Sequence, residues 1–453
     1  MVKPLSIFWF RRDLRLNDNA GLYAALKAGL PVLPLFIFDR DILDKLEDKD
    51  DARVTFLQSR VSALQHELKK LGVPMEVRYG KPLAIWKKLL KEHAVQDVYC
   101  NRDYEPYAKF RDAEVSKLVT KNGGFFHSRK DHVIFEVDEI EKKAGGTYTV
   151  FTPYSRTWRA KVESNMSVDP KGKQVSYYFK AYPTEEYFSA FAKTSKALKG
   201  SLTPSLQDMG FDESSIELPT PEADDAIIKK YDIQRDFPAK EGTSRLGMHF
   251  RHGTISIRQW ARRAKKLNQT FLNELIWRDF YSQVLQAYPN VVEQSFRPAY
   301  DEISWVNDEA LFVKWCEGKT GYPLVDAGMR ELNATGFMHN RVRMVVASFL
   351  TKHLLTDWRW GESYFARKLL DYDLASNNGG WQWAAGTGTD AAPYFRVFNP
   401  ASQLKKFDKE LKYVKHWVPE YGTDQYPDPI VEHKWARQRA LDTYKAGLAE
   451  AKG

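Results

Sequence analysis

The alternation of strand-like and helix-like segments over residues 1–130 limits the fold more than any other feature of the sequence. Four short runs rich in β-branched and aromatic residues are typical of buried strands, namely LSIFWF, PVLPLFIF, MEVRYG and VQDVYCN. Helical segments are expected at 51–72, 81–93 and 109–123. The first of these carries one apolar face, formed by Val54, Leu57, Val61, Leu64, Leu68 and Leu71. Strands and helices that alternate at this spacing predict βαβ units and a doubly wound parallel sheet.

The rest of the chain predicts a different kind of domain. From 131 to 220, Pro, Gly, Ser and Lys interrupt any periodicity, which is typical of a surface connector. Segments of helical period dominate 221–453. We therefore expect an α/β domain over 1–130, a connector over 131–220 and a mostly helical domain over 221–453. The sheet should bind a ligand at the carboxyl ends of its strands. However, no GxGxxG motif follows the first strand, so a conventional dinucleotide site is not supported.

Charge and cysteine content narrow the class of protein. The formal net charge of +9 favours a polyanionic partner. Cys100 and Cys316 are too few and too far apart for a disulfide framework or a metal site, which favours a reducing compartment. The apolar part of MVKPLSIFWFRR is too short for a signal peptide, and no apolar run approaches ~20 residues. We expect a soluble, cytoplasmic protein without a metal.

Two segments of the helical region combine polar groups with aromatic or soft side chains. In NELIWRDFY, Glu274 and Trp277 share a helical face, and Arg278 lies one turn from Glu274. A surface Glu–Arg pair beside a half-buried Trp is the simpler interpretation. In GFMHNRVRM, Asn340 and Met344 also share a face. They can hydrogen-bond and pack against a flat heterocycle, or Met344 can be ordinary core.

The segment ASNNGGWQWAAGTGTD is the least typical of a core helix. If a helix begins near Asn377, Trp381 lies on the same side and Trp383 faces roughly the other way, because residues two apart are rotated by ~200°. Gly379 and Gly380 each cost ~1 kcal/mol of helix stability relative to Ala, which indicates close approach by another group. The two tryptophans are therefore expected to line two different compartments.

Charged and hydroxyl-bearing residues add to this picture. Asp371 and Asp373 precede the segment, and Arg343 is a candidate partner for one of them. A capped core helix with packed tryptophans is the alternative, although carboxylates, Asn and Gly all resist a simple core. The stretch GTSRL at 242–246 combines a glycine, two hydroxyls and an arginine, as a phosphate-binding loop does. Loops of this composition also cap helices.

Five long motifs span the chain: FWFRRDLRLNDNAGL, RDFPAKEGTSRL, NELIWRDFY, MHNRVRM and NNGGWQWAAGTGTDAAPYFRVFNP. In this order they resemble the photolyase/cryptochrome flavoprotein family, most closely its bacterial class I branch, which repairs cyclobutane pyrimidine dimers. The resemblance implies an N-terminal α/β domain that can carry an antenna chromophore. It also implies a large all-α C-terminal domain that binds FAD.

The resemblance assigns residues to FAD. Contacts with the cofactor correspond to Tyr231, Thr243, Ser244, Arg245, Leu246 and Arg278. Arg343 and Asp371 resemble a salt bridge beside the flavin ring, and Asp373 resembles a partner of its polar edge. Asn377 resembles a catalytic residue that faces the ring nitrogen whose protonation changes on reduction. An electron relay from the surface to the flavin corresponds to Trp305, Trp358 and Trp381.

The resemblance also implies the substrate and the reaction. The pocket for the dimer corresponds to Glu274, Trp277, Asn340, Met344 and Trp383. Contacts with DNA phosphates, which position the strand without reading its sequence, correspond to Arg341, Arg396, Gln403 and Lys406. The dimer would be flipped from the duplex and split by an electron from excited reduced flavin, with Glu274 stabilising it. We expect dimer-containing DNA as the partner and a monomeric protein.

Four positions depart from the family's pattern. Gly247 and Gly386 stand where serine is usual, which leaves flavin binding intact. Ala108 and Glu293 stand where the folate-binding relatives have an acidic residue and a lysine. These last two put a folate antenna in doubt and leave a deazaflavin, a flavin nucleotide or an empty antenna pocket.

Three alternative functions share the fold or the cofactor. A cryptochrome would signal instead of repairing DNA; the pocket residues and the short stretch after VFNP disfavour it. A (6-4) photolyase relies on histidines in the pocket, where this chain has Asn340 and Met344, although His339 is adjacent. A passive DNA-binding flavoprotein is the third. Loss of dimers under blue light separates repair from the alternatives that do not repair DNA.

Overall fold

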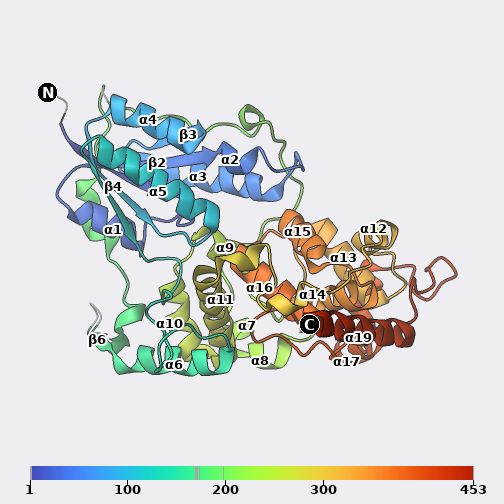
Figure 1. Ribbon diagram of the computed structural model, residues 1–453. Coiled ribbons are helices and arrows are strands. Elements are labelled where there is room, and N and C mark those ends of the chain that lie inside the picture. The colour runs from blue at the N-terminus through green and yellow to red at the C-terminus, as the bar shows by residue number, and fades with distance from the viewer. Residues whose placement is uncertain (1–2, 169–171, 173, 197, 452–453) are drawn as a thin grey trace. The chain divides into compact units, whose positions relative to one another are not determined.

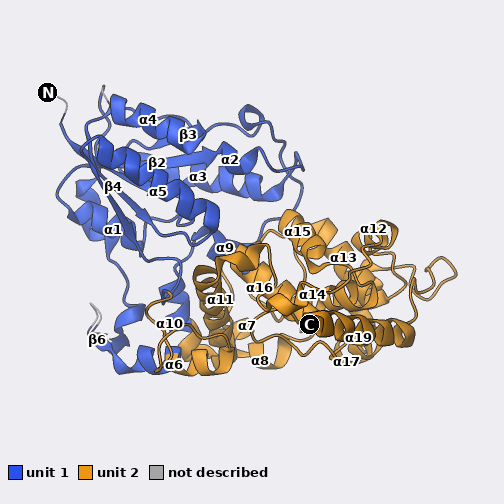
Figure 2. Ribbon diagram, in the orientation of Figure 1, with its two compact units in different colours: residues 1–136, 158–221, 246–263 blue, residues 137–157, 222–245, 264–453 orange. Residues whose placement is uncertain are grey.

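The computed structural model describes residues 3–168, 172, 174–196 and 198–451 (Figure 1). These residues form two compact units, each assembled from separate stretches of chain (Figure 2). Unit 1 comprises 1–136, 158–221 and 246–263, and unit 2 comprises 137–157, 222–245 and 264–453. The stretch predicted as a connector, 131–220, thus contributes to both units, and its residues 169–171, 173 and 197 lie outside the described part. The predicted domain limits at 130 and 220 stay a prediction.

Unit 1 is built on a five-stranded parallel sheet in the order β3-β2-β1-β4-β5. The strands are β1 (Leu5–Phe10), β2 (Val32–Asp39), β3 (Glu76–Gly80), β4 (Val95–Asn101) and β5 (Phe125–Arg129). The order reverses direction at β1, so the sheet is doubly wound, as predicted. The first four strands match the four predicted runs. Strand β5, FFHSR, was not predicted because it lies at the edge of the sheet, is only half-buried and contains three polar residues.

Side chains that alternate along the strands fill two separate cores, one on each face of the sheet. In β1, Phe8 and Phe10 pack with α1 (Ala20–Lys27) and α3 (Ala52–Lys70). Ile7 and Trp9 pack on the opposite face, against α4 (Pro82–Glu92) and α5 (Pro106–Lys121). Every strand residue of β1 and β2 is buried, which explains their continuous apolar sequence.

One residue of the predicted apolar face in α3 is placed differently. Val54, Val61, Leu64 and Leu68 are buried, whereas Leu71 is 41% exposed. The prediction for Leu71 is wrong because α3 ends at Lys70 and Gly72 then adopts a φ of +70°. The chain leaves the helix before Leu71 can follow its face.

Among the described residues, six further α-helices and strands lie wholly or partly in unit 1. They are α2 (Arg40–Leu43), α6 (Phe151–Ser164), β6 (Met166–Val168), β7 (Gln174–Ser176), α9 (Gly247–His252) and α10 (Ile257–Leu267). Strands β6 and β7 pair with each other in an antiparallel ribbon.

Unit 2 is helical, as predicted, and its described residues contain no strand of the kind that forms the sheet in unit 1. Its shorter helices are α7 (Asp225–Lys229), α8 (Tyr231–Gln234), α12 (Glu309–Cys316), α17 (Pro400–Phe407) and α18 (Lys412–Trp417). Its longer helices are α11 (Gln269–Ala287), α13 (Pro323–Thr335), α14 (Asn340–Ser348), α15 (Trp358–Lys368), α16 (Leu374–Ala385) and α19 (His433–Glu450).

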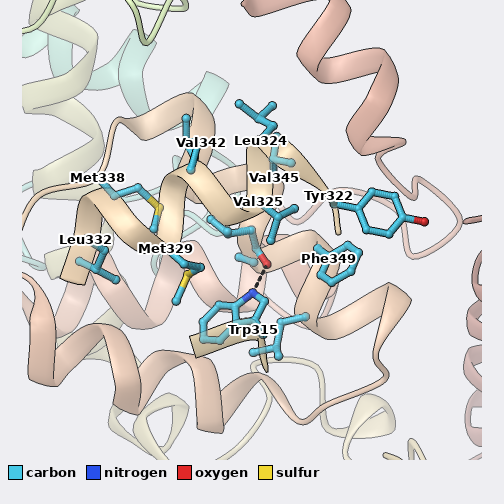
Figure 3. Packing of buried hydrophobic residues seen from close by; sticks show 14 of the residues in the cluster. Trp315, Tyr322, Leu324, Val325, Met329, Leu332, Met338, Val342, Val345 and Phe349 are labelled. Carbon is cyan, nitrogen blue, oxygen red and sulfur yellow. Dashed lines mark hydrogen bonds between the residues drawn. The ribbon is translucent and has the colours of Figure 1, made fainter. Parts of the chain in front are cut away.

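The core of unit 2 surrounds Trp315, which is fully buried (Figure 3). Residues of α13 and α14, such as Met329 and Val342, belong to the same core. The indole Nε1 of Trp315 donates a hydrogen bond to the carbonyl of Val346 at 3.2 Å, so this polar atom is satisfied inside the core. The same core includes Trp358 and Trp381, which ties α15 and α16 to the centre of the unit.

Candidate active site

Helix α16 carries the segment with the unusual composition. Asp373 caps the helix by accepting a hydrogen bond from the backbone N–H of Ser376 at 3.2 Å. The helix therefore begins at Leu374, one turn earlier than expected, and ends at Ala385; Gly386 follows as its C-cap with a φ of +85°. That left-handed backbone favours glycine at position 386.

The two tryptophans of α16 occupy different environments, as the helical geometry predicted. Trp381 is buried, and its ring lies edge-on to Phe365 at 5.0 Å and to Trp315 at 6.1 Å. Trp383 is half-buried and lies near Phe398, with ring centroids 6.5 Å apart. One tryptophan therefore belongs to the core, and the other remains partly open.

The two glycines of α16 also differ. A Cβ atom at Gly379 would lie 2.2 Å from the ring of Tyr281, so the expected close approach exists there. A Cβ atom at Gly380 would meet nothing within 4 Å, so no described residue approaches Gly380 closely and the expectation there stays a prediction. Tyr281, which belongs to α11, was not among the predicted site residues; its ring is what excludes a larger residue at position 379.

Asn377 is held by a partner on α15. Its Nδ2 donates hydrogen bonds to Oε1 of Glu362 at 2.8 Å and to the backbone carbonyl of Glu362 at 3.0 Å. Burial raises the pKa of Glu362, and the hydrogen bond from Asn377 partly opposes that rise. The Oδ1 of Asn377 accepts no hydrogen bond from the described residues. It is an acceptor available to a ligand.

The expected ion pair between Arg343 and Asp371 is present. Nη2 of Arg343 lies 2.9 Å from Oδ2 and 3.1 Å from Oδ1 of Asp371. Nε of Arg343 donates to the carbonyl of Met338 at 2.7 Å, which fixes the guanidinium plane. Both side chains are partly exposed, so the pair can still contact a ligand.

The stretch after α8 contains the hydroxyls predicted to bind phosphate. Thr243 and Ser244 are half-buried, and their hydroxyls form no hydrogen bond with the described residues. Arg245 has a φ of +52°, and its guanidinium carbon lies 4.7 Å from the ring centroid of Phe337. Tyr231 packs edge-on against Phe271 at 5.2 Å, and burial raises the pKa of its hydroxyl. Leu246 is buried and directly precedes α9.

Glu274 forms an ion pair with Arg235, not the surface pair that its spacing from Arg278 suggested. Burial raises the pKa of Glu274, and the positive charge of Arg235 partly opposes that rise. Sequence reasoning missed Arg235 because it lies in the turn after α8, with no regular spacing to Glu274. The carboxyl group of Glu274 is thus held in place by Arg235 and partly desolvated.

The neighbouring residue of the same turn, Asp236, pairs with Arg341. Nη2 of Arg341 donates to Oδ1 of Asp236 at 2.8 Å, and Nη1 lies 3.7 Å from Sδ of Met344. The guanidinium carbon also lies 4.4 Å from the ring centroid of Phe407. Asn340 is exposed at the start of α14. Arg341 therefore holds a carboxylate, and any DNA phosphate would compete with Asp236 for it.

Trp277 is covered on one side by another aromatic ring. The rings of Trp277 and Phe151 are parallel, with an interplanar angle of 4° and centroids 3.7 Å apart. Phe280 lies edge-on to Trp277 at 5.5 Å, and Tyr281 lies 5.3 Å away. Trp277 remains half-buried, so part of the indole is accessible.

The predicted relay residues share the core of unit 2. Trp358 and Trp381 are buried in it, and Trp305 is partly buried against it. A Cβ atom at Gly361, one turn along α15 from Trp358, would lie 2.1 Å from the ring of Trp381. Trp305 lies edge-on to Tyr444 at 5.9 Å. Trp315 was not among the predicted residues, although its ring also contacts Trp381.

Three predicted DNA contacts lie in or before α17. Arg396 is exposed, and its guanidinium carbon lies 5.8 Å from the ring centroid of Phe398. Gln403 is half-buried, and Lys406 is exposed with its Nζ 5.1 Å from the ring centroid of Phe407. Arg396 and Lys406 thus present positive charge on an aromatic support.

The carboxyl edge of the sheet in unit 1 is occupied by ion pairs. Nη1 of Arg12 lies 3.1 Å from Asp103 Oδ1 and 2.9 Å from Glu105 Oε1, and Arg251 lies 2.6 Å from the same Glu105 oxygen. Ala108, on α5, is buried and offers no polar group. Glu293 is exposed in unit 2. Nothing in this arrangement identifies an antenna chromophore.

Comparison with known proteins shows the family to which this chain belongs. Residues 6–172 match the family model described as DNA photolyase, and residues 271–423 match the model described as the FAD binding domain of DNA photolyase. The chain is 37% identical to the deoxyribodipyrimidine photo-lyase of Synechococcus sp., over 99% of each chain. The chain belongs to the photolyase/cryptochrome family.

Other members of the family are similar over the whole chain. The deoxyribodipyrimidine photo-lyase of Escherichia coli is 36% identical, over 97% of this chain and 98% of that protein. The crystal structure of a bacterial class III photolyase from Agrobacterium tumefaciens is 32% identical, with a TM-score of 0.82 over 99% of this chain and 98% of its own. An archaeal photolyase from Sulfolobus tokodaii, described with two FAD molecules, is 33% identical, with a TM-score of 0.77 over 98% and 100%.

A member of the family that binds FAD needs acceptors and donors of the kind unit 2 provides. The hydroxyls of Thr243 and Ser244 form no hydrogen bond with the described residues, so they can bind a diphosphate. Arg343 and Asp371 form a fixed ion pair. Asn377 has a side-chain carbonyl oxygen that is free to accept a hydrogen bond. This donor set fits FAD. Which of these residues contacts the cofactor stays a prediction.

The described residues contain no helix long and apolar enough to cross a membrane. They also contain no group of three or more His, Cys, Asp or Glu side chains that could hold a metal ion.

Proposed function

We propose that this photolyase-family protein uses blue light to repair cyclobutane pyrimidine dimers in DNA. The observation that carries the proposal is the combination on α11 of a desolvated carboxylate, Glu274, with the half-buried indole of Trp277. A pair of pyrimidines joined through a cyclobutane ring has apolar and polar edges, so it needs both an apolar wall and a group that hydrogen-bonds its polar edge. The relatives named deoxyribodipyrimidine photo-lyase support the same substrate.

Each residue of the pocket has a distinct task in this proposal. Bound, reduced FAD that has absorbed light would supply the electron that splits the dimer. Glu274 holds the polar edge of the dimer, and Arg235 holds the carboxyl group in position until the substrate contacts it. Trp277 and Trp383 form the apolar walls, with Asn340 and Met344 at the rim. The raised pKa of Glu274 also allows this carboxyl to hold a proton near the substrate.

The tryptophans in the core supply the second part of the proposal. Trp305, Trp358 and Trp381, which share one core, would form a path of oxidisable rings from the partly exposed Trp305 to α16. Buried, apolar surroundings keep water from the rings of Trp358 and Trp381. Asn377 and the pair of Arg343 and Asp371 hold the cofactor's polar groups.

We further propose that Arg341, Arg396, Gln403 and Lys406 hold the DNA backbone beside the pocket. Arg341 would exchange Asp236 for a phosphate when DNA binds. Such contacts fix the position of the strand and make affinity fall with salt, without selecting a sequence. A class I assignment, a cytoplasmic location, a monomeric state and a second chromophore such as a deazaflavin or flavin nucleotide stay predictions.

Two functions of the same family are alternatives. A cryptochrome from Synechocystis sp. is 26% identical, with a TM-score of 0.82, which keeps blue-light signalling as a candidate. A (6-4) photolyase is less well supported. His339 is buried, caps α14 through its Nδ1, and has its pKa lowered to about 4, first by burial and then by Arg343. A neutral, engaged imidazole is a poor proton donor for that reaction.

A repair assay tests the proposal. Chemically reduced protein is mixed with an oligonucleotide that carries one thymine dimer, illuminated with blue light, and compared with a dark control. We expect the dimer to be lost only in light, and Glu274→Ala to lower repair more than it lowers affinity for the oligonucleotide. No light-dependent repair of either a cyclobutane dimer or a (6-4) photoproduct would favour signalling. Repair of the (6-4) photoproduct alone would favour the second alternative.

A further inference from the structure

A short segment far upstream of the other pocket residues provides the support for Trp277. Residues 137–157 belong to unit 2, although they precede the rest of that unit by a long stretch of chain. Gln283 of α11 donates to the carbonyl of Ile140 at 2.9 Å, and Phe151 stacks on Trp277. The segment is thus attached to α11 at two points, one of them Trp277 itself.

The stacking geometry of Phe151 and Trp277 is unusually tight and flat. Aromatic pairs in proteins prefer offset or edge-to-face arrangements, with ring centroids ~4.5–7 Å apart. Here the centroids are 3.7 Å apart and the planes differ by 4°. Phe151 is 8% exposed and lies edge-on to Phe280 at 5.9 Å, so neighbouring rings hold it in place. One face of Trp277 is therefore permanently covered by protein.

The backbone of Phe151 is also anchored. Phe151 is the first residue of α6, so its N–H has no partner within the helix. Oδ2 of Asp390 accepts a hydrogen bond from this N–H at 3.3 Å. Asp390 itself has a φ of +48°, a left-handed backbone conformation. The end of the segment GTGTD thus fixes the position of the ring that supports Trp277.

We propose that Phe151 is a positioning residue for substrate binding: it sets the plane of Trp277 so that the accessible part of the indole stacks against the flipped bases. The proposal rests on the proposed function, since it assigns Trp277 to the dimer pocket. A tryptophan that can tilt offers a poorer stacking surface, because stacking depends on parallel planes in contact. Phe151 itself does not touch the substrate.

The test compares affinities in the dark, which require no photochemistry. Dissociation constants are measured for a dimer-containing and an undamaged oligonucleotide of the same sequence, and their ratio is the preference for the lesion. We expect Phe151→Leu to reduce this preference about threefold to tenfold, the range that an aromatic pair contributes beyond its buried area. Phe151→Tyr and Phe151→Trp, which restore a flat ring, should restore it.

Two further variants separate positioning from general destabilisation. Phe312→Leu makes the same change against Trp315, where the rings lie 5.7 Å apart at 18°, and should leave the preference unchanged. Asp390→Gly removes the anchor of Phe151 but suits the left-handed backbone, and should lower the preference, whereas Asp390→Asn should not. Thermal melting and bound-flavin absorbance show whether each variant is folded.

The outcomes distinguish the two proposals. If the unmodified protein shows no preference for dimer-containing DNA, the proposed function fails, whatever Phe151 does. If it shows the preference and folded Phe151→Leu keeps it, Phe151 has no positioning role. If Phe151→Leu does not fold, Asp390→Gly decides: an unchanged preference overturns the inference.

Discussion

Asn377 on α16 and Glu362 on α15 are joined by two hydrogen bonds from a single amide, one to the carboxylate at 2.8 Å and one to the backbone carbonyl at 3.0 Å. Both bonds come from Nδ2, so the orientation of the amide is fixed and Oδ1 points away from Glu362. The carboxyl group of Glu362 therefore sets the direction in which Oδ1 of Asn377 can accept a hydrogen bond. This relationship makes Glu362 a second group that can influence the proposed flavin site.

The pH response of the flavin site should depend on Glu362. Burial raises the pKa of this carboxyl, so it holds a proton at pH values where an exposed glutamate is ionised. We expect the rate of flavin photoreduction to change across that raised pKa, above the ordinary range of a glutamate. Glu362→Gln keeps an acceptor for Asn377 but cannot titrate, and should abolish the change. Photoreduction followed by absorbance across a pH series measures this; identical profiles would disconnect Glu362 from the flavin.

Gly361 should be intolerant of any side chain. The Cβ atom of Gly361→Ala would lie 2.1 Å from the ring of Trp381, so the indole or α15 must move. We expect a loss of about 1–3 kcal/mol in the free energy of unfolding, as for overpacked cores, and slower photoreduction. Gly380→Ala is the matched control, since its Cβ meets nothing within 4 Å. It should raise stability by up to ~1 kcal/mol. Chemical denaturation compares the two, and equal effects would contradict the contact with Trp381.

Trp381→Phe should separate photoreduction from repair. The indole is more easily oxidised than a phenyl ring, so the variant should lose most photoreduction of the oxidised flavin. Repair by chemically reduced protein should remain largely intact, because the proposed pocket uses Trp383 and Trp277. Flash photolysis measures the first and the dimer assay measures the second. Loss of both activities would place Trp381 in the pocket itself, not in a relay.

Acid should destabilise unit 2 through His339. Its pKa is about 4 in the folded protein and 6.5 in the unfolded chain, so the unfolded state binds the proton more tightly between these values. The contribution of neutral His339 to the free energy of unfolding is fully present above pH 6.5. It decreases by about 3 kcal/mol as the pH drops towards 4. His339→Asn retains an N-cap acceptor and should flatten that part of the profile. Urea denaturation from pH 7 to pH 4 measures the difference, and parallel profiles for the two proteins would refute this assignment.

The strands of the sheet were predictable because their apolar runs are continuous, which fully buried parallel strands require. The edge strand β5 lacks that signal, since water reaches both its ends. The helical faces of Glu274, Trp277, Asn377 and Trp381 were predictable for a similar reason: a period of 3.6 residues determines which side chains share a side. These patterns depend only on local sequence.

The partners of these side chains were not predictable. Glu274 pairs with Arg235 and Asn377 bonds Glu362, and neither pair has a spacing that a helix or strand would produce. Gly379 and Gly380 are adjacent and identical, yet only one faces the ring of Tyr281. Phe151 lies in a stretch whose composition is typical of a connector. Such contacts depend on where separate elements meet, which no local period encodes.

The interleaving of the two units along the chain has a consequence for how the protein can be divided. Since residues 137–157 complete unit 2, a fragment that begins at residue 222 lacks both Ile140 and Phe151. Neither unit is a contiguous cassette, so a single recombination breakpoint between two homologous genes cannot exchange one unit whole. A chimera joined near residue 220 would combine an α11 from one parent with a supporting ring from the other.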